Sequence, residues 1–121
     1  MATKDNKIVF VFGSNYAGRH GAGAALYARN HYGARYGVGK GRQGNAYAIP
    51  TKDGYLRSLP LNVIQAHVNE FIEYAASEPA TEFLLTRVGC GLAGYKDSQI
   101  APMFKNAPEN CMLPEEWKEY V

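Results

Sequence analysis

Apolar residues along this chain form short continuous runs that alternate with segments of helical periodicity. Three runs predict strands, at residues 8–12 (IVFVF), 46–49 (AYAI) and 83–88 (FLLTRV). Such runs of β-branched and aromatic residues are typical of strands that are buried on both faces. Pro50 is expected to end the second strand, and a last short strand is predicted over residues 110–113.

Two longer segments between these strands predict helices. Residues 22–33 are rich in helix formers and stop at a glycine, which commonly follows a helix end. Further on, Ser58 and Pro60 can begin an amphipathic helix, because apolar side chains then recur at helical spacing. The predicted buried face of that helix comprises Ile64, Val68, Phe71, Ile72 and Ala75.

Two further segments complete the pattern. Asp97 is predicted to cap a short helix over residues 98–105, and the glycine-rich stretch 33–44 is predicted to be a loop. Strands and helices alternate along the chain, which predicts an α/β sandwich with parallel strand pairs. A length of 121 residues suffices for one hydrophobic core, so we expect a single domain over residues 1–121.

Glycine-rich turns follow two of the predicted strands, at residues 18–24 and 89–94. Backbone without side chains at the carboxyl end of a buried strand lets a phosphate approach peptide N–H groups closely. The carboxyl ends of parallel strands form one edge of a sheet, where ligands of α/β proteins bind. Two such turns at one edge therefore predict a ligand that carries a diphosphate.

Composition narrows the classes of partner. The chain is 46% apolar and 20% charged, which is typical of globular domains and excludes a disordered or membrane-embedded chain. Its formal net charge is only +2, and its one basic cluster, at Lys40 and Arg42 near Arg35, is interrupted by glycine. The composition therefore makes no strong case for direct nucleic-acid binding.

Cysteines and histidines show no ligand pattern. Cys90 and Cys111 match no zinc spacing, and His20, His31 and His67 form no paired motif, so we expect no metal and no cofactor. The first twelve residues contain too short an apolar run for a secretory signal or a membrane span. We therefore expect a cytoplasmic protein with reduced thiols and no membrane partner.

Three strings, in this order, resemble a macro domain: residues 19–25 (RHGAGAA), 47–52 (YAIPTK) and 87–92 (RVGCGL). The resemblance implies a three-layer α/β/α sandwich with a mixed, largely parallel sheet that binds ADP-ribose. The strings are most similar to the terminal ADP-ribose protein glycohydrolase subgroup, which includes macro-domain antitoxins that reverse DNA ADP-ribosylation. The short chain resembles a compact phage or bacterial version. The implied partner is ADP-ribose, a related NAD-derived nucleotide or an ADP-ribosylated macromolecule.

The resemblance also assigns binding residues to two loops. The first loop is implied to wrap the distal ribose and a phosphate, and the second is implied to hold the diphosphate through its N–H groups. The implied ligand-binding residues are Gly13, Asn15, Arg19, Gly21, Ala22, Gly23 and Ala24 in the first region, and Val88, Gly89, Cys90, Gly91, Leu92, Ala93, Gly94 and Tyr95 in the second.

A catalytic role is implied for Lys52, which matches the lysine that attacks C1 of the distal ribose in the glycohydrolase subgroup. The subgroup's partner acid is replaced here by Ala93. His20 or Asp97 is then the candidate proton carrier. Ala93 favours the alternative hypothesis, a non-catalytic reader or sponge for ADP-ribose or a cyclic NAD-derived signal. A third hypothesis is a nucleic-acid-associated protein that does not use the pocket. The aspartate that reads adenine in many macro domains has no counterpart.

Simpler roles stay open for several of these residues. Asn15 can cap a turn, and Lys52 can be a surface residue of the turn that follows its strand. Cys90 is expected to be a packing residue rather than a nucleophile. Tyr36 and Lys40 can either fold over a ligand as a lid or belong to a surface loop.

Overall fold

The structure is a computed structural model that describes residues 8–121. Its described residues form a mixed sheet with the strand order β2-β3-β1-β4-β5. β1 lies at the centre and pairs in parallel with β3 and β4, β4 pairs in parallel with β5, and β2 pairs antiparallel with β3. The strands are β1 (Ile8–Asn15), β2 (Gly41–Gln43), β3 (Ala46–Lys52), β4 (Glu82–Leu85) and β5 (Cys111–Met112).

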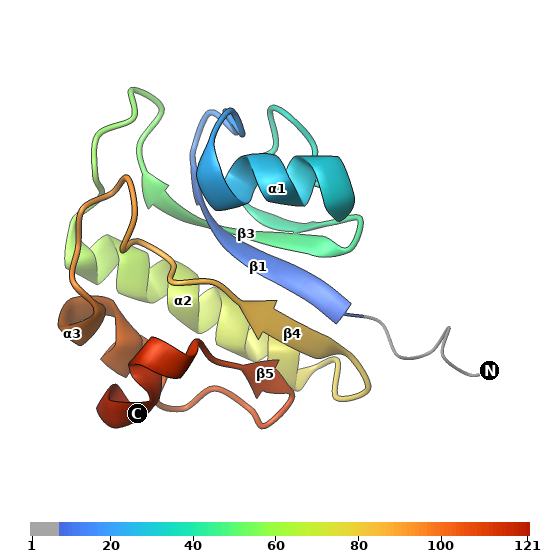
Figure 1. The fold of residues 1–121 in the computed structure, drawn as a ribbon, viewed down its shortest axis with the longest axis vertical. Coiled ribbons are helices and arrows are strands. Elements are labelled where there is room, and N and C mark those ends of the chain that lie inside the picture. The colour runs from blue at the N-terminus through green and yellow to red at the C-terminus, as the bar shows by residue number, and fades with distance from the viewer. Residues whose placement is uncertain (1–7) are drawn as a thin grey trace.

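Helices cover both faces of this sheet (Figure 1). α1 packs on one face, and α2, α3 and two 3-10 helices pack on the other. The predicted α/β class with a mixed, largely parallel sheet is confirmed. The helices are α1 (Gly23–His31), α2 (Leu61–Ala76), α3 (Asp97–Ile100), η2 (Ala101–Phe104) and η3 (Glu115–Tyr120).

The central strand β1 contributes to two separate cores. Side chains alternate along a strand, so Phe10 and Phe12 pack in the small core under α1, and Val9 and Val11 pack in the larger core under α2. All four are at most 7% exposed. This two-sided burial explains why the strand has no polar residue before its carboxyl end.

α2 buries most of the face that its periodicity predicts, and Ile72 of that face is only partly buried. Ile64, Val68, Phe71 and Ala75 are fully buried, and each of the larger side chains contributes roughly 1.5–3 kcal/mol relative to exposure. The residue immediately before the helix is Pro60 rather than Ser58. The Ser58 hydroxyl instead donates to the Ala93 carbonyl oxygen at 2.6 Å, which links this turn to the second glycine-rich turn.

The carboxyl ends of three strands differ from the prediction, and the first is β1, which continues beyond residue 12 to Asn15. β3 continues through Pro50 to Lys52. The Asn45 carbonyl faces β1, where it accepts a hydrogen bond from the Phe10 N–H. Because the backbone polar groups of successive residues face alternate neighbouring strands, the Pro50 nitrogen faces the β2 side. β2 pairs only as far as Ala48, so the ladder needs no donor from Pro50. β4 ends at Leu85, earlier than predicted, because the chain leaves the sheet there to form the second turn.

The predicted loop 33–44 contains the short strand β2, which was not predicted because the segment is rich in glycine. The rest of the loop packs against the end of β1, where Gly37 N–H donates to the Gly18 carbonyl at 2.8 Å. A Cβ added at Gly39 would overlap the carbonyl oxygen of Asn15. The third helical segment is divided into α3 and η2, with Asp97 as the first helical residue rather than the cap. The short last strand is confirmed as β5.

Within residues 8–121, no helix combines the length and the apolar character needed to cross a bilayer. The prediction that the first residues form no secretory signal rests partly on residues 1–7, which lie outside the described part of the chain.

The close packing of Gly39 against β1 generates a stability prediction. We expect Gly39→Ala to lower the free energy of unfolding by about 2 kcal/mol or more, since the new methyl group must displace the Asn15 backbone. Gly54→Ala is the matched control, because a Cβ there meets no atom within 4 Å, and it should change stability by no more than about 0.5 kcal/mol. Urea denaturation measures both values. Equal stability of the two variants would contradict the packing argument.

Candidate functional site

A cleft of about 660 Å³ lies at the carboxyl edge of β1 and β3 and beside the turn that follows β4. Small-molecule sites have volumes of about 300–1,000 Å³. The two glycine-rich turns therefore line one cavity. Its lining residues are Gly13, Ser14, Asn15, Arg19, Gly21, Ala22, Gly23, Ala24, Ala25, Thr51, Lys52, Leu56, Thr86, Arg87, Val88, Gly89, Cys90, Gly91, Leu92 and Ala93.

Backbone donors are available on both walls of the cleft. Within residues 8–121, the N–H groups of Gly21 and Ala22 form no hydrogen bond, and α1 has no side-chain cap at its start. On the opposite wall the N–H groups of Gly91, Leu92 and Ala93 are likewise without an acceptor among the described residues. Such groups can bind the oxygens of an anion.

Charge in the cleft is entirely positive. Arg19, Lys52 and Arg87 line it, and none of the lining residues within 8–121 is Asp or Glu. In the same part of the chain, no three His, Cys, Asp or Glu side chains gather closely enough to hold a metal ion. The lining therefore suits an anionic organic ligand.

Lys52 lies at the end of β3, where a tight turn begins. Asp53, its neighbour, accepts hydrogen bonds from the N–H groups of Tyr55 and Arg57 at 2.8 and 3.0 Å and pairs with the Arg57 side chain. The pKa of Asp53 is lowered, mainly by the bond from the Arg57 backbone. Asp53 therefore shapes the turn, and its carboxylate is engaged by the backbone and side chain of that turn.

Asn15 uses its side-chain amide within its own turn. Its Oδ1 accepts from the Arg19 N–H at 3.0 Å, and its Nδ2 donates to the Arg19 carbonyl at 3.2 Å. Asn15 is only 7% exposed although it lines the cleft. The structure thus gives Asn15 the turn-closing role, and ribose contact stays a prediction.

His20 is fully buried and lies outside the cleft lining. Its Nε2 is 3.4 Å from Ser14 Oγ, its ring meets Phe12 edge-on, and its Nδ1 has no partner among residues 8–121. Burial, followed by the charge of Arg29, lowers the pKa of His20, so the ring is neutral at neutral pH. Ser14 separates His20 from the cleft, and its role as proton carrier stays a prediction.

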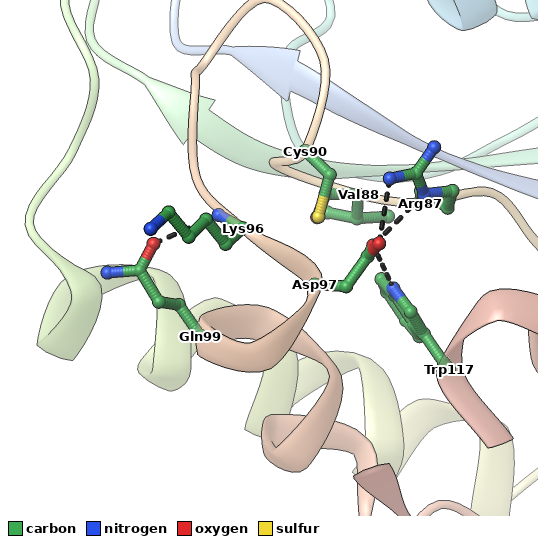
Figure 2. A network of polar contacts seen from close by, with 7 residues as sticks. All are labelled: Arg87, Val88, Cys90, Lys96, Asp97, Gln99 and Trp117. Atoms are coloured by element: carbon green, nitrogen blue, oxygen red, sulfur yellow. Dashed lines mark hydrogen bonds and ion pairs between the residues drawn. The ribbon is translucent and has the colours of Figure 1, made fainter. Parts of the chain in front are cut away.

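Asp97 also lies away from the cleft lining, in a fixed network (Figure 2). The Arg87 guanidinium donates to both carboxylate oxygens, at 3.0 and 2.7 Å, and the Trp117 indole N–H donates at 2.7 Å. These bonds, Arg87 first and Trp117 second, lower the pKa of Asp97 to about 2. The carboxylate thus stays ionised and links the cleft-lining Arg87 to Trp117 of η3, an arrangement that suits a structural role better than proton transfer.

Three other predicted residues stabilise the second turn. Burial, with a smaller contribution from Asp97, raises the pKa of Cys90 to about 12, so its thiol stays protonated, as packing residues do. Gly94 N–H donates to the Gly91 carbonyl, and Gly94 has a φ of 84° that favours glycine. The Tyr95 hydroxyl donates to the Leu59 carbonyl at 2.6 Å. Gly94 and Tyr95 therefore support the turn from outside the cleft lining.

The predicted lid residues also lie outside the lining. Lys40 pairs with Glu70 of α2, with 3.6 Å between Nζ and Oε1. The Arg29 guanidinium lies 5.3 Å from the centre of the Tyr36 ring. Both residues belong to a loop that packs against the end of β1.

Sequence reasoning missed five polar or bulky lining residues. Ser14 and Thr51 are the next-to-last residues of β1 and β3, Thr86 follows β4 directly, and Arg87 is a cation beside a glycine turn, so a signal existed for these four. No sequence pattern predicts that Leu56 lines the cleft. Its position depends on a left-handed backbone conformation with a φ of 65°, which is rare for residues other than glycine.

Comparison of the chain with protein-family models, with curated proteins and with solved structures found no match.

The Asp97 network generates a pH prediction. Its pKa is about 2 in the folded protein against an ordinary value of 3.8, so its contribution to stability is present above 3.8 and is lost as the pH falls toward 2. We expect Asp97→Asn to lower the thermal midpoint at neutral pH, with the difference from wild type narrowing below pH 3.8. Fluorescence of the chain's single tryptophan, Trp117, reports the transition. A difference that does not change with pH would contradict the assignment.

Glu109→Gln is the control for this experiment. Glu109 is exposed and forms no ion pair within residues 8–121. Its substitution should leave the thermal midpoint close to that of wild type across the same pH range.

Proposed function

We propose that this protein binds ADP-ribose or a related NAD-derived nucleotide in the cleft between its two glycine-rich turns. The observation that carries the proposal is the lining of that cleft, which has backbone N–H donors in both turns, the cations Arg19 and Lys52 with no ion pair, and no carboxylate among the described residues. A diphosphate carries negative charge on several oxygens, and such a lining supplies donors and charge of matching kind.

The macro-type sandwich belongs to the same proposal. Three sequence strings resemble that family, and a mixed five-stranded sheet between helical layers is consistent with it. In this arrangement the diphosphate would lie against the two turns, with Arg19 and Arg87 nearby. The exposed side chains of Leu56 and Leu92 would pack against less polar parts of the ligand.

Two versions of this function differ at Lys52. In a glycohydrolase, the Lys52 amine would attack C1 of the distal ribose and displace the target molecule to which ADP-ribose is attached. Water would then displace the lysine from C1 and release ADP-ribose. The amine must first lose a proton, and no carboxylate lines the cleft among residues 8–121 to take it. Asp53 and Asp97 are both engaged elsewhere. This absence favours binding without cleavage, as a reader or sponge.

The binding proposal predicts a measurable affinity. Isothermal titration calorimetry with ADP-ribose should give a dissociation constant in the micromolar range or tighter. Gly21→Val should weaken binding at least about tenfold, because Gly21 lines the cleft and a Cβ there enters open space. Its thermal midpoint should change little, since the backbone there needs no left-handed conformation.

Gly54→Val is the matched control, because Gly54 also has open space for a Cβ but does not line the cleft. It should bind ADP-ribose as wild type does. Absence of heat with ADP-ribose, NAD and AMP alike would mean that the cleft takes another ligand or none.

The choice between binding and cleavage is tested with ADP-ribosylated protein and DNA substrates. We expect wild type to release no ADP-ribose during a long incubation, and Lys52→Ala to lose no more than about tenfold in affinity, as for one partly exposed charged contact. Product formation by wild type that stops in Lys52→Ala, with affinity kept within a few-fold, would replace the reader with the glycohydrolase.

A further inference from the structure

The net charge of the chain is small, but its positive and negative residues are unevenly distributed along the sequence. Residues 8–52 contain six Arg and Lys residues and no Asp or Glu, whereas residues 53–121 contain ten Asp and Glu residues and five Arg and Lys residues. The first segment supplies α1, its flanking loops and the β2 edge, and the second supplies α2, α3 and η3. These two sets of helices lie on opposite faces of the sheet (Figure 1). The α1 side therefore carries cations and no carboxylate from residues 8–52, whereas α2, α3 and η3 carry six of the ten carboxylates.

Three arginines on the cationic side are free to meet a partner. Arg19, Arg29 and Arg35 are exposed, and within residues 8–121 none of them has a carboxylate within ion-pair distance. By contrast, Lys40 pairs with Glu70, and the Arg42 guanidinium donates to the Tyr74 hydroxyl at 2.8 Å. Three cations without an ion pair thus lie on α1 and its flanking loops.

These arginines follow one another from the mouth of the cleft. Arg19 lines the cleft, and the Arg29 guanidinium donates to the carbonyl of the next residue, His20, at 3.4 Å. The Arg29 guanidinium also lies 5.3 Å from the centre of the Tyr36 ring, and Arg35 precedes that tyrosine. Together they form a cationic strip that begins at the cleft-lining Arg19 and extends over α1 to the loop that carries Arg35 and Tyr36.

A buried side chain fixes the loop that carries part of this strip. Gln43, only 2% exposed, accepts from the Arg35 N–H at 2.6 Å and donates to the Val38 carbonyl at 3.0 Å. Tyr36 between them is 60% exposed, although Arg29 lies against its ring. The loop therefore presents the Tyr36 ring and Arg35 from a defined backbone, beside Arg29 of α1.

We propose that this strip, formed by Arg19, Arg29, Arg35 and Tyr36, binds single-stranded nucleic acid. Guanidinium groups pair with the phosphates of a strand, and an exposed ring beside them stacks on a base. Bases are open to stacking when they are unpaired, which favours a single strand over a duplex. The acidic opposite side repels a polyanion and so directs the strand to this face.

Fluorescence anisotropy with a labelled oligo(dT) of about 12 nucleotides tests the proposal, at salt concentrations from about 50 to 200 mM. The double variant Arg29→Glu with Arg35→Glu should bind at least about tenfold more weakly. Because each phosphate contact on a single strand contributes about 0.7 to the log–log salt slope, that slope should become shallower by about 1.4. Unchanged affinity in the double variant would overturn the proposal.

The matched control is Lys96→Glu with Lys105→Glu, which changes the net charge equally but alters exposed residues of the acidic side. It should keep its affinity within about twofold. An equal loss in both double variants would mean that only the net charge matters and would overturn the strip. Arg35→Glu alone should still weaken binding about threefold if Arg29→Glu disturbs the fold, since no hydrogen bond of the Arg35 side chain occurs within residues 8–121.

Substitutions of the ring separate stacking from charge. Tyr36→Phe should bind within about twofold of wild type, and Tyr36→Ala should bind at least about fivefold more weakly, because only the former keeps an aromatic face. Equal affinity in all three proteins would remove the stacking part of the proposal.

Vesicles that contain phosphatidylserine provide the other anionic surface. Stronger binding to these vesicles than to the oligonucleotide, with the same loss in the arginine variant, would identify a membrane surface as the partner and overturn the proposal.

Discussion

The cleft depends on the convergence of three backbone segments at Gly13, near the carboxyl end of the central strand β1. A Cβ added there would lie 3.4 Å from the Gly89 nitrogen and 3.5 Å from Thr51 Oγ1. The turn after β4 and the end of β3 therefore pack directly against β1 at this residue, within van der Waals contact of a Cβ placed there. This contact brings both glycine-rich turns to one cavity, and the lining follows from it.

The sequence predicts the parts of the structure that depend on local pattern. The runs around Val9 and Phe83 predict strands, and Ile64 to Ala75 predicts the buried face of α2, because burial imposes a period on each. Both glycine-rich turns could be placed at one sheet edge for the same reason. The prediction that Pro50 ends its strand is wrong, because the effect of a proline depends on which neighbouring strand its nitrogen faces. That direction is a property of the sheet and not of the local sequence.

The side chains of the site are harder to predict than its backbone. Asp97 and His20 are residue types suited to proton transfer, but Asp97 is held by Arg87 and Trp117, and His20 is enclosed behind Ser14. These contacts join residues that are far apart in the chain or that depend on the turn at Asn15, and no local pattern encodes them. The net charge is similarly uninformative, because opposite charges collect on opposite faces of the sheet.

The short strands at the two edges of the described sheet have a consequence for self-association. β2 has three residues and β5 has two, so a second chain that docked at either edge would find few free backbone groups. Where β3 extends beyond β2, it carries Pro50, which has no N–H to offer. The sheet is thereby protected from edge-to-edge growth into aggregates, and the proline that weakened the strand prediction contributes to this protection.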